Sequence, residues 1–251
     1  MSEHIKREEE NGVLHLRLNR PEKKNAMTED MYRGLADGLK EADGRDDICA
    51  VLLSGEGDSF TSGNDLSAFA SVLTMDQGTR PPVLDLIEAG LKSETPLIAA
   101  VEGWCVGIGA TMMLHTDFIY AGRSARFHMP FTELGAVPEA GASHLLTRRF
   151  GRQRAAEMMI ASKVLPAEKA ERWGFITEVV EDGDALAAGK EMAAHIASLP
   201  PQSVRDTKKL MTEDLGSILP HTEHELKVFA GRLRSEEMQA VIAKKMARKS
   251  G

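Results

Sequence analysis

The sequence predicts an α/β fold in which strand–helix units come first and helices alone follow. Two short apolar runs, residues 48–54 and 96–101, are bounded by turn residues and are typical of buried strands. Residues 83–91, which lie between these runs, have a helical pattern. From residue 184 onward every pattern is helical, so the chain is expected to end in a helical region.

The first part of the chain predicts one strand and one amphipathic helix. Apolar and polar residues alternate over Val13–Asn19, which predicts a half-exposed strand. Thr28 then suits the N-cap position of a helix, because its hydroxyl can accept a backbone hydrogen bond. Met31, Leu35 and Leu39 follow at a spacing of four residues, so they share one face of that helix.

The remaining elements are mainly helical. The stretch around Leu66 is expected to lead into a helix, and residues 70–82 are polar, irregular and expected to be mobile. One further short strand is predicted at residues 176–180. Helices are predicted at residues 110–115, 142–150, 153–160, 166–174, 185–198, 203–215, 220–234 and 235–248.

Composition and charge narrow the class of protein. The chain has 251 residues, of which 42% are apolar and 27% charged, and this suits one globular domain with or without a helical appendix. A net charge of −7 and a pI near 5.7 argue against a nucleic-acid-binding protein. Cys49 and Cys105 lie in apolar runs and are expected to be reduced core residues.

Targeting signals are also missing from the patterns at the two ends. No apolar run reaches the length of a membrane span, and the charged start MSEHIKREEE has no apolar core of a secretory signal. The last residues, ARKSG, do not form the peroxisomal Ser-Lys-Leu signal. A cytoplasmic protein without membrane contact is therefore expected.

Two glycine-containing loops are candidates for binding a negatively charged oxygen. The apolar run 96–101 is followed by a turn rich in glycine and then by a buried helix, a sequence that leaves backbone N–H groups unpaired. In the loop FTSGNDL, Gly63 permits a turn that exposes the N–H of Asn64, although an ordinary turn would need the same residues. If the loops follow adjacent strands, each can give one donor to a single oxygen.

A single carboxylate, Glu139, follows about thirty residues after the glycine-rich turn that ends at Gly109. It lies in Pro-Glu-Ala-Gly, at the start of another predicted helix. N–H donors and one carboxylate are the groups needed to remove a proton beside a carbonyl. The alternative is that Glu139 only complements the dipole of the helix.

Three other motifs that would indicate a different function are incomplete in this sequence. The turn at Gly107 lacks the third glycine of a dinucleotide-binding fingerprint, and Gly141–Leu145 lacks the closing glycine of a nucleophile elbow. A group of His and Glu residues does not have the spacing His-Glu-x-x-His, so we expect a solvated helix start and no metal site. This group comprises His221, Glu223, His224 and Glu225.

Four segments of the chain occur in a specific combination and order. They are FTSGNDL, AAVEGWCVGIGATMML, HMPFTELGAVPEAGAS and LPAEKAERWGFITEVV. Taken together, these motifs resemble the enoyl-CoA hydratase/isomerase (crotonase) family over about Ile5–Arg248. The resemblance implies a crotonase-like ββα spiral core over residues 1–198 and a helical C-terminal region over residues 199–251 that makes homotrimers, or hexamers as dimers of trimers. It also implies that the N–H groups of Asn64 and Ile108 hold the thioester oxygen.

Departures from the family pattern indicate the reaction. Family hydratases use two glutamates to activate water, but this chain has Thr111 and Phe131 at those positions. Glu139 instead resembles the single catalytic glutamate of peroxisomal-type Δ3,Δ2-enoyl-CoA isomerases, and Glu133 is a rival base. We therefore expect an isomerase that moves the double bond of a 3-enoyl-CoA to give trans-2-enoyl-CoA. The alternatives are a hydratase or other crotonase-type enzyme, and a non-catalytic acyl-CoA-binding protein.

The resemblance also implies where the coenzyme A thioester binds. No separate cofactor is expected, because this thioester is itself the substrate. The expected substrate-binding residues come from several separate parts of the chain. The basic loop at Lys23 and Lys24 is expected to meet the phosphates of coenzyme A. They are Lys23, Lys24, Ser62, Gly63, Asp65, Leu66, Gly107, Phe131, Phe229 and Lys245.

Overall fold

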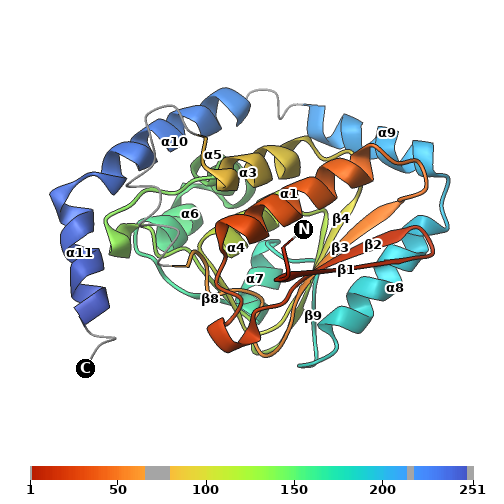
Figure 1. Cartoon of the computed structure of the whole chain (residues 1–251), viewed down its shortest axis with the longest axis horizontal. Helices are drawn as coiled ribbons and strands as arrows, with labels where there is room; N and C mark the ends of the chain where they lie inside the picture. Colours follow the sequence, from red (N-terminus) through yellow and green to blue (C-terminus); the bar gives the residue numbers. More distant parts are fainter. Residues whose placement is uncertain (1, 66–79, 214–217, 248–251) are drawn as a thin grey trace.

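A computed structural model describes residues 2–65, 80–213 and 218–247 and contains a six-stranded sheet in the order β1-β2-β3-β4-β6-β9 (Figure 1). Each neighbouring pair is parallel except β1 and β2, which form an antiparallel hairpin. The strands are β1 (Ile5–Glu10), β2 (Val13–Leu18), β3 (Ala50–Gly55), β4 (Leu97–Val101), β6 (Phe118–Gly122) and β9 (Glu178–Val180).

Helices cover both faces of this sheet. On one face, α1 (Glu29–Asp43) and α3 (Pro82–Lys92) pack on the apolar side chains of the central strands. On the other face, α8 (Ala185–Ala197) packs on Leu52 and Ile98. The predicted continuous apolar strands are confirmed, because both faces of β3 and β4 are buried.

A second, three-stranded sheet lies beside the first. It comprises β5 (Trp104–Val106), β7 (Arg126–His128) and β8 (Leu165–Pro166). The sequence placed residues 103–109 in one turn, and that prediction was wrong for β5. This strand has only three residues between Gly103 and Gly107, too few for an alternating pattern to be recognised.

Two further differences concern the first hairpin. The sequence did not predict β1, because its residues IKREEE are charged; they form an edge strand in which ion pairs such as Arg7–Glu41, at 2.7 Å, hold the side chains. The prediction that β2 is half-exposed was also wrong. His15 is 5% exposed and its Nε2 lies 2.7 Å from the hydroxyl of Ser54, because α8 extends over this part of the sheet.

The predicted helices agree with the structure within a few residues. Thr28 caps α1, accepting a hydrogen bond from the N–H of Met31 at 3.4 Å. The helix near Leu66 and most of the region 70–82 lie outside the described residues. The other helices are α4 (Ile108–Met112), α5 (Ala142–Phe150), α6 (Arg152–Met159), α7 (Ala167–Trp173), α9 (Pro201–Thr212), α10 (Ile218–Leu233) and α11 (Glu236–Ala247), with 3-10 turns η1 (Pro21–Lys23), η2 (Met113–His115) and η3 (Thr132–Leu134).

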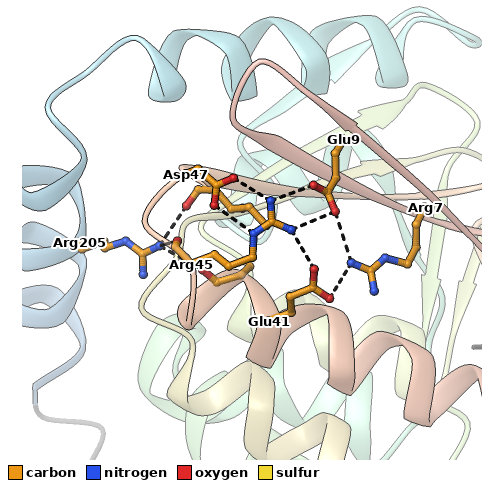
Figure 2. A network of polar contacts seen from close by, with 8 residues as sticks. Arg7, Glu9, Glu41, Arg45, Asp47 and Arg205 are labelled. Atoms are coloured by element: carbon orange, nitrogen blue, oxygen red, sulfur yellow. Dashed lines mark hydrogen bonds and ion pairs between the residues drawn. The ribbon is translucent and has the colours of Figure 1, made fainter.

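The last three helices extend along the outside of this core (Figure 1). Arg205 of α9 reaches the turn after α1, where its guanidinium lies 3.0 Å from the carbonyl oxygen of Arg45 and 2.9 Å from that of Ile48. Figure 2 shows Arg205 beside a network in which Arg45 pairs with Glu9, Glu41 and Asp47. One turn further along α9, the ammonium group of Lys208 lies 2.8 Å from the carbonyl oxygen of Thr95 and 2.7 Å from the carboxylate of Asp117.

No described helix combines the length and the apolar composition needed to cross a membrane. Cys49 and Cys105 are both free thiols, as expected. Cys105 is a buried core residue, but Cys49 is only half-buried, so its assignment to the core was wrong.

Replacement of the buried Lys208 by Met should lower the free energy of unfolding by about 2 kcal/mol, because it leaves the half-buried Asp117 carboxylate without its cation. Urea denaturation would measure the loss. The adjacent Lys209 forms only an exposed ion pair with Glu94, so Lys209→Met should leave stability near the wild-type value. Equal losses in the two variants would contradict this account of how α9 is attached.

Candidate active site

The two glycine-containing loops of the sequence analysis lie side by side. They follow β3 and β4, which are adjacent and parallel, so both loops leave the same edge of the sheet. Thr61 forms a bridge with Cys105: the N–H of Thr61 donates to Trp104, and the N–H of Val106 donates to Thr61 at 3.0 Å. Gly63 has a φ of +91°, and a Cβ there would lie 3.1 Å from the carbonyl oxygen of Val106. Glycine is therefore required for this close approach.

Each loop ends in an unpaired backbone donor. Ile108 is the first residue of α4, so its N–H has no partner within the helix. Asn64 follows Gly63, and no acceptor among the described residues pairs with its N–H or with that of Ile108. The two preceding glycines are neighbours, because a Cβ on Gly107 would lie 3.9 Å from the Cα of Gly63. The structure thus brings both predicted donors to one place.

The loop that carries Asn64 is fixed from several sides. The buried hydroxyl of Tyr32, in α1, donates to the side-chain oxygen of Asn64. The N–H of Met27 donates to the carbonyl of Gly63 at 2.8 Å, and the N–H of Asp65 donates back to Met27 at 2.9 Å. These bonds limit the orientation of the Asn64 peptide.

Glu139 is buried, with 6% of its surface exposed. One carboxylate oxygen, Oε1, accepts a hydrogen bond from the hydroxyl of Thr111 at 2.6 Å. The other, Oε2, has no partner among the described residues. Burial raises the pKa of Glu139 to about 7; the Thr111 hydrogen bond opposes this shift and the charge of Glu225 adds to it. A buried carboxylate with a free oxygen and a pKa near neutrality is typical of a catalytic group.

The base and the donors are linked through α4. Thr111, which binds Glu139, lies three residues after Ile108, about one helical turn along the same helix. Tyr32 provides a second link, because it binds Asn64 and its own pKa is raised by burial and by the negative charge of Glu139. The arrangement supplies a proton acceptor in the same buried region as donors for a developing negative charge.

The rival base Glu133 lies elsewhere. Its side chain is 50% exposed, and its carboxylate lies 3.6 Å from the imidazole of His128. The neighbouring Phe131, by contrast, is buried. Glu133 therefore lacks the dry surroundings that distinguish Glu139.

The expected substrate-binding residues are only partly brought together. The N–H of Ser62 donates to the carbonyl of Lys24 at 2.8 Å, which places the exposed Lys23–Lys24 loop beside the FTSG loop. The carboxylate of Asp65 forms an ion pair with Arg20 at 2.6 Å, so it supports this loop. Phe229 is half-buried in α10. Leu66 and the side chain of Lys245 lie outside the described residues.

Residues 221–225, which were predicted to be a solvated helix start, lie within the first two turns of α10. Thr222 and Glu225 are buried, whereas Glu223 and His224 are exposed, so the expectation of a wholly solvated segment was wrong. Residues His221 and Glu225 share one face because they are four apart, and this spacing was the available signal. No group of three or more potential metal ligands occurs among the residues that the structure describes.

Two other residues near Glu139 were missed by the sequence analysis. The imidazole Nε2 of His115 lies 2.9 Å from the carbonyl oxygen of Ala140, and burial lowers the pKa of this histidine to about 4. Tyr32 was overlooked because it follows Met31 on a helix already assigned to the core. A half-buried histidine and a buried tyrosine need polar partners, but the sequence alone does not identify those partners.

Comparison with known proteins agrees with these observations. The profile of the enoyl-CoA hydratase/isomerase family matches residues 8–247, nearly the whole chain. The chain belongs to this family. Membership implies an acyl-CoA substrate, and it confirms the crotonase-type fold expected from the motifs.

Several members of the family are similar over most of the chain. The 1,2-epoxyphenylacetyl-CoA isomerase of Escherichia coli (strain K12) is 36% identical over 213 residues, which cover 80% of this chain and 78% of that protein. Enoyl-CoA delta isomerase 2 of Rattus norvegicus is 34% identical over 245 residues, which cover 96% of this chain but 62% of that longer protein. The crystal structure of an enoyl-CoA hydratase/isomerase from Pseudoalteromonas atlantica T6c matches with a TM-score of 0.94 and 38% identity over 98% of each chain.

The raised pKa of Glu139 predicts a pH-dependent stability. The carboxyl group titrates at 4.5 when unfolded and at about 7 when folded, so ionisation above pH 4.5 costs the folded state free energy. Relative to the wild type, Glu139→Gln should therefore gain about 3 kcal/mol of stability between pH 4.5 and pH 8. Urea denaturation at several pH values measures this difference. Glu133→Gln should show no such gain, and a pH-independent difference for Glu139→Gln would contradict the prediction.

Proposed function

We propose that this protein is a Δ3,Δ2-enoyl-CoA isomerase, which converts a 3-enoyl-CoA to trans-2-enoyl-CoA by moving a proton from C2 to C4. The observation that carries this proposal is Glu139: a buried carboxylate that has one oxygen without a partner among the described residues and a pKa of about 7. It is bound to α4, and the first N–H of this helix, that of Ile108, has no acceptor in the described part of the chain.

The first step is removal of a proton from C2 of the substrate. This carbon lies between the thioester carbonyl and the double bond, so its conjugate base is a dienolate with charge on the thioester oxygen. Glu139 takes the proton while the electrons of the C–H bond move toward that oxygen. The N–H groups of Asn64 and Ile108 stabilise the charge as it develops, because they are fixed before the reaction begins.

The second step returns the same proton to C4. C2 and C4 belong to the same planar dienolate. A single base above one face of this plane can therefore reach both carbons. A pKa of about 7 suits both roles, since the group must accept a proton and then release it at neutral pH. The buried side chains of Phe131 and Ile108 limit access of water, which would otherwise add to the product.

Isomerase activity is favoured over hydratase activity by two positions. Thr111 and Phe131 stand where family hydratases are expected to have glutamates, and neither can act as a base at neutral pH. The hydroxyl of Thr111 is used as a donor to Glu139. Similarity to enoyl-CoA delta isomerase 2 of Rattus norvegicus supports the same choice. A protein that only bound acyl-CoA would have no need for a buried carboxylate whose pKa is near 7.

Substrate binding and assembly follow from the same proposal. The exposed Lys23 and Lys24, beside Ser62, would meet the phosphates of coenzyme A, and Phe229 and Lys245 would close the site from the C-terminal helices. Three further points stay predictions: the boundary between the core and the C-terminal region at residues 198/199, assembly into homotrimers or hexamers, and a cytoplasmic location.

The assay for this function is the conversion of 3-hexenoyl-CoA to the conjugated 2-enoyl-CoA, followed by ultraviolet absorbance. Glu139→Gln should lower kcat by about a thousandfold, because it removes the base while keeping the shape of the side chain. Glu133→Gln should retain activity. Lack of conversion by the wild type would remove the isomerase proposal, and hydration of crotonyl-CoA or turnover of 1,2-epoxyphenylacetyl-CoA would then identify the alternative.

Gly63→Ala tests the oxyanion donors. The added Cβ would lie 3.1 Å from the carbonyl oxygen of Val106 and must displace the loop that ends at Asn64. We expect kcat to fall roughly a hundredfold, the cost of one lost donor. Gly174→Ala is the matched control, because Gly174 also has a positive φ but a Cβ added there would have no atom within 4 Å. Similar activity of both variants would argue against the assigned donor.

A further inference from the structure

Helix α10 places a second buried carboxylate close behind Glu139. Glu225 is 6% exposed, and its Oε2 accepts a hydrogen bond from the N–H of Gly141 at 2.7 Å. Its Oε1 accepts from the N–H of Ser143 at 2.9 Å and also from the hydroxyl of Ser143. A side chain from the C-terminal helices therefore caps the start of α5, two residues after the proposed base.

The backbone between Glu139 and this cap is in an unfavourable conformation. Ala140 has a φ of +60° and Gly141 a φ of +72°, and the left-handed region is costly for alanine. The carbonyl oxygen of Ala140 lies 2.9 Å from the imidazole of His115, and the next N–H is held by Glu225. The Ala140–Gly141 peptide, one residue beyond the base, is thus fixed on both sides.

Close packing leaves this segment little room to relax. A Cβ on Gly141 would lie 3.0 Å from Ile218 and 3.1 Å from the hydroxyl oxygen of Thr222, so α10 is in direct contact with the turn. Without the Glu225 carboxylate, the backbone N–H groups of the buried Gly141 and the half-buried Ser143 would lose their acceptor.

Several polar groups face the two carboxylates from the surrounding elements. Around Glu139 these are the hydroxyl groups of Thr111 in α4 and Tyr32 in α1, and His115 in η2, which is neutral because burial lowers its pKa to about 4. Beside Glu225, the Nε2 of His221 lies 3.5 Å from Oε1, and its ring centroid lies 5.1 Å from that of His144 in α5.

No lysine or arginine among the described residues forms an ion pair with either carboxylate. The negative charge of Glu225 is therefore balanced mainly by backbone and hydroxyl donors. Such a charge in a buried region makes ionisation of a neighbouring carboxyl group harder, and it contributes to the raised pKa of Glu139.

We propose that Glu225 is a positioning residue of the active site, which fixes the Ala140–Gly141 peptide beside Glu139 and places a second negative charge behind this base. The proposal rests on the proposed role of Glu139. It gives the C-terminal helical region a part in proton transfer as well as in packing, since the residue that adjusts the base comes from α10.

The decisive variant is Glu225→Gln, compared with Glu223→Gln on the exposed side of the same helix. The amide of the first variant has no charge and only one acceptor for the two N–H groups, so we expect kcat at high pH to fall roughly tenfold through misplacement of the base. The acid limb of the pH profile of kcat/KM should also move to lower pH, because the pKa of Glu139 falls when the second charge is removed. Glu223→Gln should change neither quantity. A lower rate with an unmoved acid limb would reduce Glu225 to a structural role and overturn the proposal.

A second measurement does not depend on isomerase activity. The carboxyl carbon of Glu139 can be titrated by ¹³C NMR and assigned by its loss in Glu139→Gln. The midpoint should be lower in Glu225→Gln than in the wild type and unchanged in Glu223→Gln. Identical midpoints in all three proteins would overturn the proposal even if the enzyme had another substrate.

If Glu225→Gln does not fold, Ser143→Ala provides another test, in which the titration midpoint of Glu139 is expected to shift in the opposite direction. This variant keeps the charge of Glu225 but removes one of its donors, so the charge is less balanced and the midpoint of Glu139 should rise. An unchanged or lower midpoint would contradict the proposed electrostatic link.

Discussion

A hydrogen bond between Thr111 and Glu139 joins the two halves of the site. One half is the start of α4, which the glycine turn directs toward the loop of Asn64; the other is the turn before α5, which carries the carboxylate. Because the bond occupies one oxygen of Glu139, it determines which oxygen is free to receive a proton. It also favours the ionised form and so keeps burial from making the group too weak an acid to release its proton at neutral pH.

The arrangement of the sheet brings the parts of the site together. Parallel pairing of β3 and β4 brings two loops from distant parts of the sequence to the same edge, and the bridge between Thr61 and Cys105 continues the alignment beyond the strands. The helices on both faces bury the side chains of these two strands. Side chains from α1 and α10 complete the surroundings, so the chemistry of one carboxylate depends on elements from nearly the full length of the chain.

The sequence was sufficient to predict the elements with strong periodicity and the residues that sit in recognisable loops. The spacing of Met31, Leu35 and Leu39 predicted α1, and the Pro-Glu-Ala-Gly segment indicated Glu139 at the start of a helix. It was not sufficient for contacts made between elements. The burial of Glu225 depends on where α10 is placed, and a polar helix start looks the same in sequence whether or not its neighbours cover it. The strand β1 was missed for a related reason, because pairing with β2 stabilises a charged segment whose own composition does not favour a strand.

The composition of β1 has a consequence for behaviour at high concentration. Unpaired strand edges can pair with strands of other molecules, and proteins discourage this with charges or with very short outer strands. Here one outer strand carries the run Lys6, Arg7 and three glutamates, and the opposite one, β9, has only three residues. The main sheet is thus protected against growth from either side, which favours resistance to fibrous aggregation.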